Sequence, residues 1–158
     1  MSVSITKATI SSAIFKNFRD RIVDQVASVN TSISPGSFTI QKYLSSYSDV
    51  DFSSKDNFPV IVIESPRVPQ EQFTFGKTNV TGTIDIEVYA TNSQAADKFR
   101  DAINNAIETY KSDFADLGLQ MIELEDTDSD FVEHGNIKVH IRTSRFSFNY
   151  KFSRSRAF

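Results

Sequence analysis

The chain has 158 residues, no cysteine and a formal net charge of −3, which excludes a disulfide framework and a thiolate metal site. Its hydrophobic fraction of 39% and its 14 phenylalanines suffice for one domain, which at this length buries about 70% of the unfolded chain's surface. The longest purely aliphatic run, residues 60–63, is too short to span a bilayer, so we expect a soluble protein with no membrane partner.

The first third of the chain predicts a helix, a short strand and a loop. Apolar residues recur at helical spacing over residues 7–29, and the turn-forming Pro35 and Gly36 follow. Residues 38–43 alternate well enough for a short strand. Residues 45–57 are rich in Ser and Asp without a period, so we expect an exposed loop there.

A buried strand and an arm come next. Residues 58–64 contain four β-branched residues in succession, which predicts a central strand covered on both faces. Pro66 and Pro69 forbid a regular ladder, so the following segment should be an edge or an arm that carries Phe73 and Phe75 to a turn. These two rings are expected either to contact a partner or to fold back as part of the core.

The most regular stretch is a strand that runs into a helix. Residues 80–91 alternate apolar and polar side chains, as in a half-exposed antiparallel strand. Asn92 and its neighbours can cap a helix, and Phe99, Ile103 and Ile107 then recur at helical spacing.

The last third predicts two strands. We expect a strand at residues 117–125, an acidic turn at 126–130, and a long strand at 137–152. The apolar positions of the last strand change parity between Ile141 and Phe146, which predicts a bulge or a sharp twist at residues 143–145.

These elements predict a single α+β domain over residues 1–158, with flexible ends at 1–6 and 153–158. Its order is α-β-β-β-α-β-β. The expected sheet is mixed and mostly antiparallel, with four to five strands, two amphipathic helices on one face, and a hairpin or arm.

Charge is distributed unevenly near the C-terminus. Residues 112–133 carry eight acids and no Lys or Arg, whereas residues 134–158 carry six Lys or Arg and no acid. Two interpretations stay open: solvated strand faces that attract one another across a hairpin, or complementary surfaces on neighbouring subunits.

No catalytic, cofactor or metal site is predicted. Asp126, Asp128 and Asp130 have the spacing that opens a calcium loop, but Phe131 stands at its glycine position and Ile137 at its final acid. A loose divalent-cation site there stays an alternative.

Three segments resemble one known family. They are the apolar strand at 58–63, the strand IDIEVYATNS at 84–93, and the helix start Ala96-Asp97-Lys98-Phe99. With the opening helix, they resemble the tail terminator (tail-completion, tail-to-head joining) proteins of long-tailed bacteriophages over residues 7–152.

The resemblance implies a homo-oligomeric ring, typically hexameric, that caps the tail tube, fixes its length and joins the head. Its partners would be further copies of itself, the tail tube protein and a head-completion or neck protein, with DNA passing through the lumen without specific binding. It would be assembled in the host cytoplasm and located in the virion at the tail–neck junction. Candidate subunit or tube contacts are Phe73, Phe75, Arg142, Arg145, Phe146, Phe148 and Tyr150. Candidate lumen-facing acids are Glu123, Glu125, Asp126, Asp128 and Asp130.

Three other functions stay open. One is another neck or head–tail connector component. The second is a nucleic-acid-binding module, because basic and aromatic residues alternate in the last strand. The third is a small α+β enzyme whose site is built from scattered residues.

Overall fold

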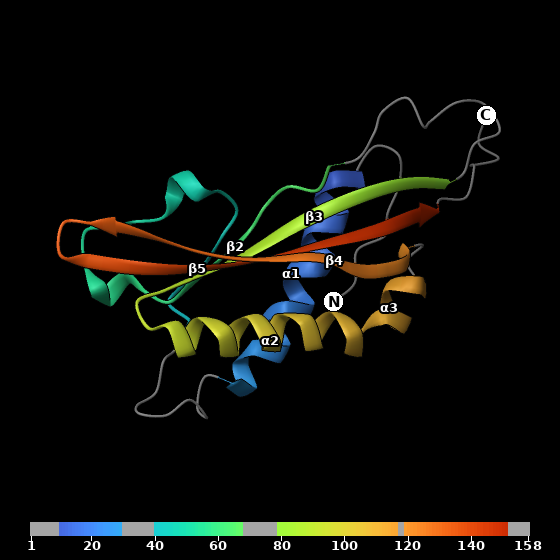
Figure 1. The fold of residues 1–158 in the computed structure, drawn as a ribbon. Coiled ribbons are helices and arrows are strands. Elements are labelled where there is room, and N and C mark those ends of the chain that lie inside the picture. The colour runs from blue at the N-terminus through green and yellow to red at the C-terminus, as the bar shows by residue number, and fades with distance from the viewer. Residues whose placement is uncertain (1–9, 30–39, 68–78, 117–118, 152–158) are drawn as a thin grey trace.

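The computed structural model describes residues 10–29, 40–67, 79–116 and 119–151 (Figure 1). Its elements are α1 (Ile10–Val29), β1 (Lys42–Leu44), the 3₁₀ helices η1 (Tyr47–Asp49) and η2 (Lys55–Asn57), β2 (Val60–Ile63), β3 (Asn79–Ala90), α2 (Ser93–Thr109), α3 (Lys111–Asp116), β4 (Leu119–His134) and β5 (Ile137–Lys151). The predicted α+β class and element order are confirmed, with α3, η1 and η2 in addition. No helix among the described residues is both long and apolar enough to cross a membrane.

The five strands form one mixed sheet in the order β1-β2-β3-β5-β4. β1 runs parallel to β2, and all other neighbours are antiparallel. β3 and β5 pair without interruption from Asn79 opposite Lys151 to Ala90 opposite His140. β4 is therefore an edge strand, and it is the longest strand of the sheet.

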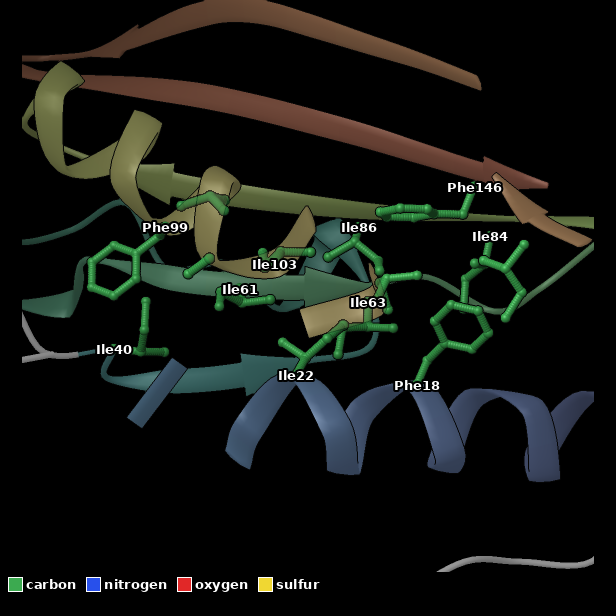
Figure 2. Close-up of a cluster of buried hydrophobic side chains, with 14 of the residues drawn as sticks. Phe18, Ile22, Ile40, Ile61, Ile63, Ile84, Ile86, Phe99, Ile103 and Phe146 are labelled. Atoms are coloured by element: carbon green, nitrogen blue, oxygen red, sulfur yellow. The ribbon is translucent and has the colours of Figure 1, made fainter. Parts of the chain in front are cut away.

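The helices cover one face of this sheet, where the main core lies (Figures 1 and 2). Phe18 and Ile22 of α1 point at β2 and β3, and Phe99 of α2 is fully buried in the same cluster. α2 begins where predicted, because the Asn92 side chain accepts a hydrogen bond from the Ala95 amide at 3.0 Å. Each large apolar side chain buried here contributes about 1.5–3 kcal/mol to folding.

A second, smaller cluster covers one end of the opposite face. It joins Val60 and Val62 of β2 to Tyr89, Val139 and Phe58. All four residues of β2 are therefore buried, which confirms the strand predicted to be covered on both sides.

The acidic turn predicted at residues 126–130 is wrong, because these residues lie inside β4 and pair with β5. The chain turns instead at Gly135 and Asn136, and Gly135 has the positive φ of +60° that a two-residue hairpin turn requires. The outer edge of an edge strand is exposed to solvent. β4 therefore tolerates a run of polar residues, which resembles a turn in the sequence.

The bulge predicted in the last strand is also misplaced. β5 is regular against β3, whereas the register shifts lie in β4, between Gln120 and Glu123 and between Leu124 and Asp126. The change of parity in β5 has another cause. Val139 contributes to the cluster on the far face, but Phe146 and Phe148 contribute to the core under the helices.

Several predictions lie outside the described residues. These are the flexible ends, the start of the first helix, and the arm with Phe73, Phe75 and its turn at residues 76–78. The main chain of Tyr150 is described as part of β5, but its side chain is not.

Candidate functional site

The face of the sheet turned away from the helices carries a network of ion pairs. Arg145 of β5 donates from Nε to Asp85 Oδ1 at 2.8 Å and from Nη2 to Asp85 Oδ2 at 3.1 Å. Arg67 approaches the same carboxylate at 3.6 Å. The Asp85 side chain is only 10% exposed, whereas Arg145 is 42% exposed. This two-bond pair therefore fixes the arginine of β5 onto β3.

The carboxyl groups of Glu87 and Glu64 lie beside this network. The hydroxyl of Tyr89 donates to Glu87 Oε1 at 3.3 Å. Burial, together with repulsion from Glu64, raises the pKa of Glu87 to about 7. Burial also raises the pKa of Tyr89. Glu87 can therefore bind a proton near neutral pH.

The depression in the surface beside these ion pairs is small. It has a volume of about 190 Å³ and is lined by Glu64, Arg67, Asp85, Ser45, Ser65 and Thr83. Ligand pockets usually measure about 300–1,000 Å³ and are mostly apolar. This depression is smaller and more polar than a usual ligand pocket.

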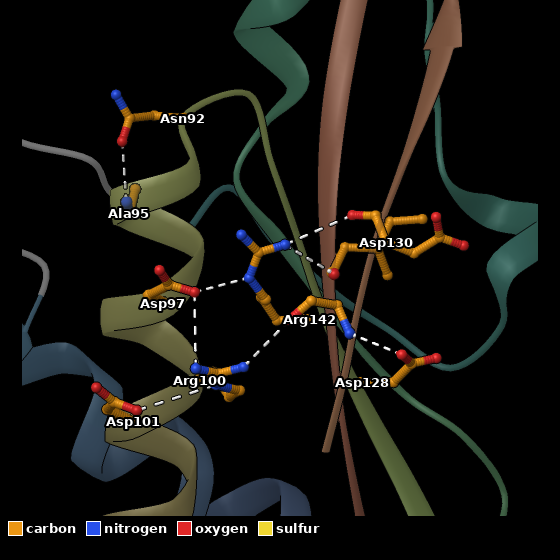
Figure 3. A network of polar contacts seen from close by, with 10 residues as sticks. Asn92, Ala95, Asp97, Arg100, Asp101, Asp128, Asp130 and Arg142 are labelled. Carbon is orange, nitrogen blue, oxygen red and sulfur yellow. Dashed lines mark hydrogen bonds and ion pairs between the residues drawn. The ribbon is translucent and has the colours of Figure 1, made fainter.

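On the helix side, a second arginine of β5 is held by α2 (Figure 3). Arg142 donates from Nε to Asp97 Oδ1 at 2.7 Å, and only 12% of its side chain is exposed. Its Nη1 also lies 3.5 Å from the carbonyl oxygen of Asp130. Figure 3 also shows Arg100, which lies 3.7 Å from Asp97 and 3.5 Å from the Ser129 hydroxyl. These contacts fasten the hairpin of β4 and β5 to α2.

β4 is very different, because most of its side chains face solvent. Met121, Leu124 and Phe131 are 70%, 43% and 50% exposed. Its six acids are exposed as well, and none of them forms an ion pair within the described residues. They are Glu123, Glu125, Asp126, Asp128, Asp130 and Glu133. We call this strand surface the acidic edge.

The acidic edge has a defined orientation. Asp126, Asp128 and Asp130 lie opposite Arg145, Thr143 and Ile141 of β5. Cross-strand partners share a face, so all three aspartates lie on the face away from the helices. Within the described residues, no group of three potential ligands is close enough to hold a metal ion. The alternative of a divalent-cation site gains no support.

An apolar groove adjoins the start of the acidic edge. It has a volume of about 440 Å³ between α3 and β4, and its lining includes Ala115, Leu119, Met121 and Ile122. A partner that pairs with β4 would therefore meet apolar surface as well as charge.

The residues predicted to contact another subunit or the tube lie in different environments in the structure. Phe146 and Phe148 are 2% and 1% exposed inside the main core. This corrects their prediction as subunit or tube contacts, because a neighbouring molecule cannot reach them. Arg142 and Arg145 are engaged by Asp97 and Asp85 of the same chain.

The five acids predicted to face a lumen are all exposed on β4. Whether they line a channel stays a prediction. Sequence reasoning missed Asp85 and Glu87, which alternation in β3 assigned to a solvated face. Asp85 pairs with Arg145 on another strand, which only the register of the sheet reveals, whereas Glu87 bonds to Tyr89 two residues along the same strand.

The sequence was also compared with known proteins. No protein-family model matches it, and no curated protein matches it either.

Proposed function

We propose that this chain is a structural protein of a phage virion that forms a homo-oligomeric, six-fold ring at the tail–neck junction. The ring caps the tail tube, ends its polymerisation and joins the tail to the head. Its partners are its own copies, the tail tube protein and a neck protein. DNA passes through its lumen.

The acidic edge carries this proposal. A long edge strand with unpaired backbone groups is a template for association with another chain. Here it also exposes Met121, Leu124 and Phe131, together with six acids that lack ion-pair partners among the described residues. Such a strand is suited to binding another protein molecule.

The charge of this surface also suits a channel for DNA. Acids repel phosphates, so a lumen lined by them lets DNA slide without adhering. Asp126, Asp128 and Asp130 share one face, so a ring that directs this face inward presents a continuous negative surface.

The nucleic-acid-binding alternative receives less support. It rests on basic and aromatic residues of β5, but Arg142 and Arg145 are engaged in ion pairs. Phe146 and Phe148 are buried and cannot stack on bases.

The test is the oligomeric state of the full chain as a function of concentration, measured by light scattering with negative-stain images of the same fractions. We expect annular particles with an open centre. DNA binding at graded salt serves as the control, and we expect it to be weak. A monomer at every concentration that binds DNA tightly, with steep salt dependence, would overturn the proposal in favour of the nucleic-acid-binding module.

A further inference from the structure

The acidic edge lacks a partner strand in the described part of the chain. Among the described strands, β4 is the terminal one and pairs only with β5. Alternate amide and carbonyl groups of its 16 residues point outward. An added strand would satisfy these groups by the same hydrogen bonds that hold the sheet together.

The acids of β4 form no ion pair within the described residues, although Arg145 lies opposite Asp126 and attracts Asp126 and Glu125 electrostatically. Arg142 and Arg145 are the basic residues of β5 nearest to the aspartates, but they bind Asp97 of α2 and Asp85 of β3. Asp128 and Asp130 are exposed and form no ion pair with the described residues, so both carboxylates are open to a cationic partner.

The same charge excludes one obvious partner. Two copies of β4 would place acid against acid, and like charges directly opposite one another destabilise a strand pair. The partner should therefore be a different, cationic and extended segment.

The last seven residues of the chain, 152–158, meet these requirements in sequence. They read FSRSRAF, with two arginines and no acid. Arg154 and Arg156 are two residues apart, so in an extended strand both point to one face, as Asp128 and Asp130 do in β4. Seven extended residues span roughly 24 Å, enough to follow about half of β4.

We propose that residues 152–158 of one copy add as a strand to the acidic edge of the next copy, with Arg154 and Arg156 facing Asp128 and Asp130. The donor and acceptor surfaces differ, so the contact is head-to-tail and can close into a ring. This inference names the contact that would join neighbouring subunits of the proposed ring. It rests on the proposed function only in that these contacts close into a ring. The strand addition itself can occur in a dimer or an open chain.

The test exchanges charge between the two surfaces in the full chain. The first variant combines Asp128→Arg with Asp130→Arg, so that its edge and its tail are both basic. The second combines Arg154→Glu with Arg156→Glu, so that both are acidic. A third, Asp49→Arg with Asp56→Arg, makes the same charge change in the exposed segment that carries η1 and η2.

We expect each of the first two variants, when alone, to self-associate at least about tenfold more weakly than the wild-type chain. Mixed in equal amounts, they should co-assemble, because every contact in an alternating assembly again joins opposite charges. The third variant should assemble as the wild-type chain does. Light scattering measures all five samples, including the wild-type chain, and circular dichroism verifies that each variant is folded.

Two results would overturn the inference. One is normal assembly of either variant alone, and the other is failure of the mixture to recover. If the tail instead bound the edge of its own chain, mixing would change nothing. Rings that survive both variants would contradict the inference and leave the proposed ring intact. Recovery in linear or dimeric particles would support the inference and contradict the ring.

Discussion

β4 and β5 are two strands of one hairpin, yet their side chains have opposite environments. β5 is satisfied within the chain, because Phe146 and Phe148 fill the core and Arg142 and Arg145 are held by aspartates. β4 leaves large apolar and acidic side chains in solvent. The difference separates residues that stabilise the protomer from residues that are available to a partner.

The largest effect should come from truncating a ring of β5. We expect Phe148→Ala to lower the free energy of unfolding by about 3–5 kcal/mol, because it leaves a cavity beside Phe18. Phe131→Ala on β4 is the matched control. It removes a half-exposed ring under Lys138 and should cost at most about 1 kcal/mol. Urea denaturation of both variants measures the contrast, and equal costs would remove the distinction between the strands.

The next largest effect should come from filling the space between Gly82 and the Phe148 ring. A Cβ at Gly82 would lie 2.8 Å from Phe148 Cζ and 2.8 Å from the Arg67 carbonyl oxygen. Gly82→Ala should therefore cost about 1–3 kcal/mol through overpacking. In a Phe148→Leu background the cost should shrink, because only the backbone contact remains. Strict additivity of the two substitutions in denaturation experiments would argue against this contact.

A smaller effect is expected from removing the ion pair between Asp85 and Arg145. Asp85→Asn should lower the free energy of unfolding by about 1–2 kcal/mol. This is the lower part of the range for hydrogen bonds to charged groups, because Arg145 is 42% exposed. Asp128→Asn, which has no ion pair among the described residues, is the control and should be neutral or slightly stabilising. A more damaging Asp128→Asn would reverse the assignment of the two aspartates.

A last effect is a dependence on pH. The pKa of Glu87 is about 7 in the folded chain against an ordinary 4.5, so between these values the folded state holds a proton that the unfolded state has lost. The contribution of Glu87 to stability is therefore present at low pH and is lost as pH rises from about 4.5 to about 7. Urea midpoints at the two ends of this window should differ less for Glu87→Gln than for the wild-type chain. An unchanged difference would mean that other groups cause it.

The sequence predicted the parts of the fold that depend on local periodicity. The strand of β3, the cap at Asn92 and the doubly buried β2 were all visible in the pattern of apolar and polar residues. β4 was mistaken in part for a turn, because residues 126–130 are all polar and exposed and therefore show no hydrophobic period. Gly135 and Asn136 were the better turn signal.

The candidate site was less predictable for a different reason. Asp85 and Arg145 are 60 positions apart in the chain, and only the pairing of β3 with β5 brings them together. Likewise, the parity of β5 revealed that its two halves face different surroundings. It did not reveal that the aromatic half faces the helices of its own chain.

Hydrogen–deuterium exchange tests most directly whether β4 is the assembly strand. The exchange of the full chain is compared between dilute and assembled samples. Assembly should slow the outward amides of residues 119–134 while leaving those of β5, already bonded on both sides, nearly unchanged. Assembly that protects other surfaces and leaves β4 exchanging at its dilute rate would contradict the role of the acidic edge.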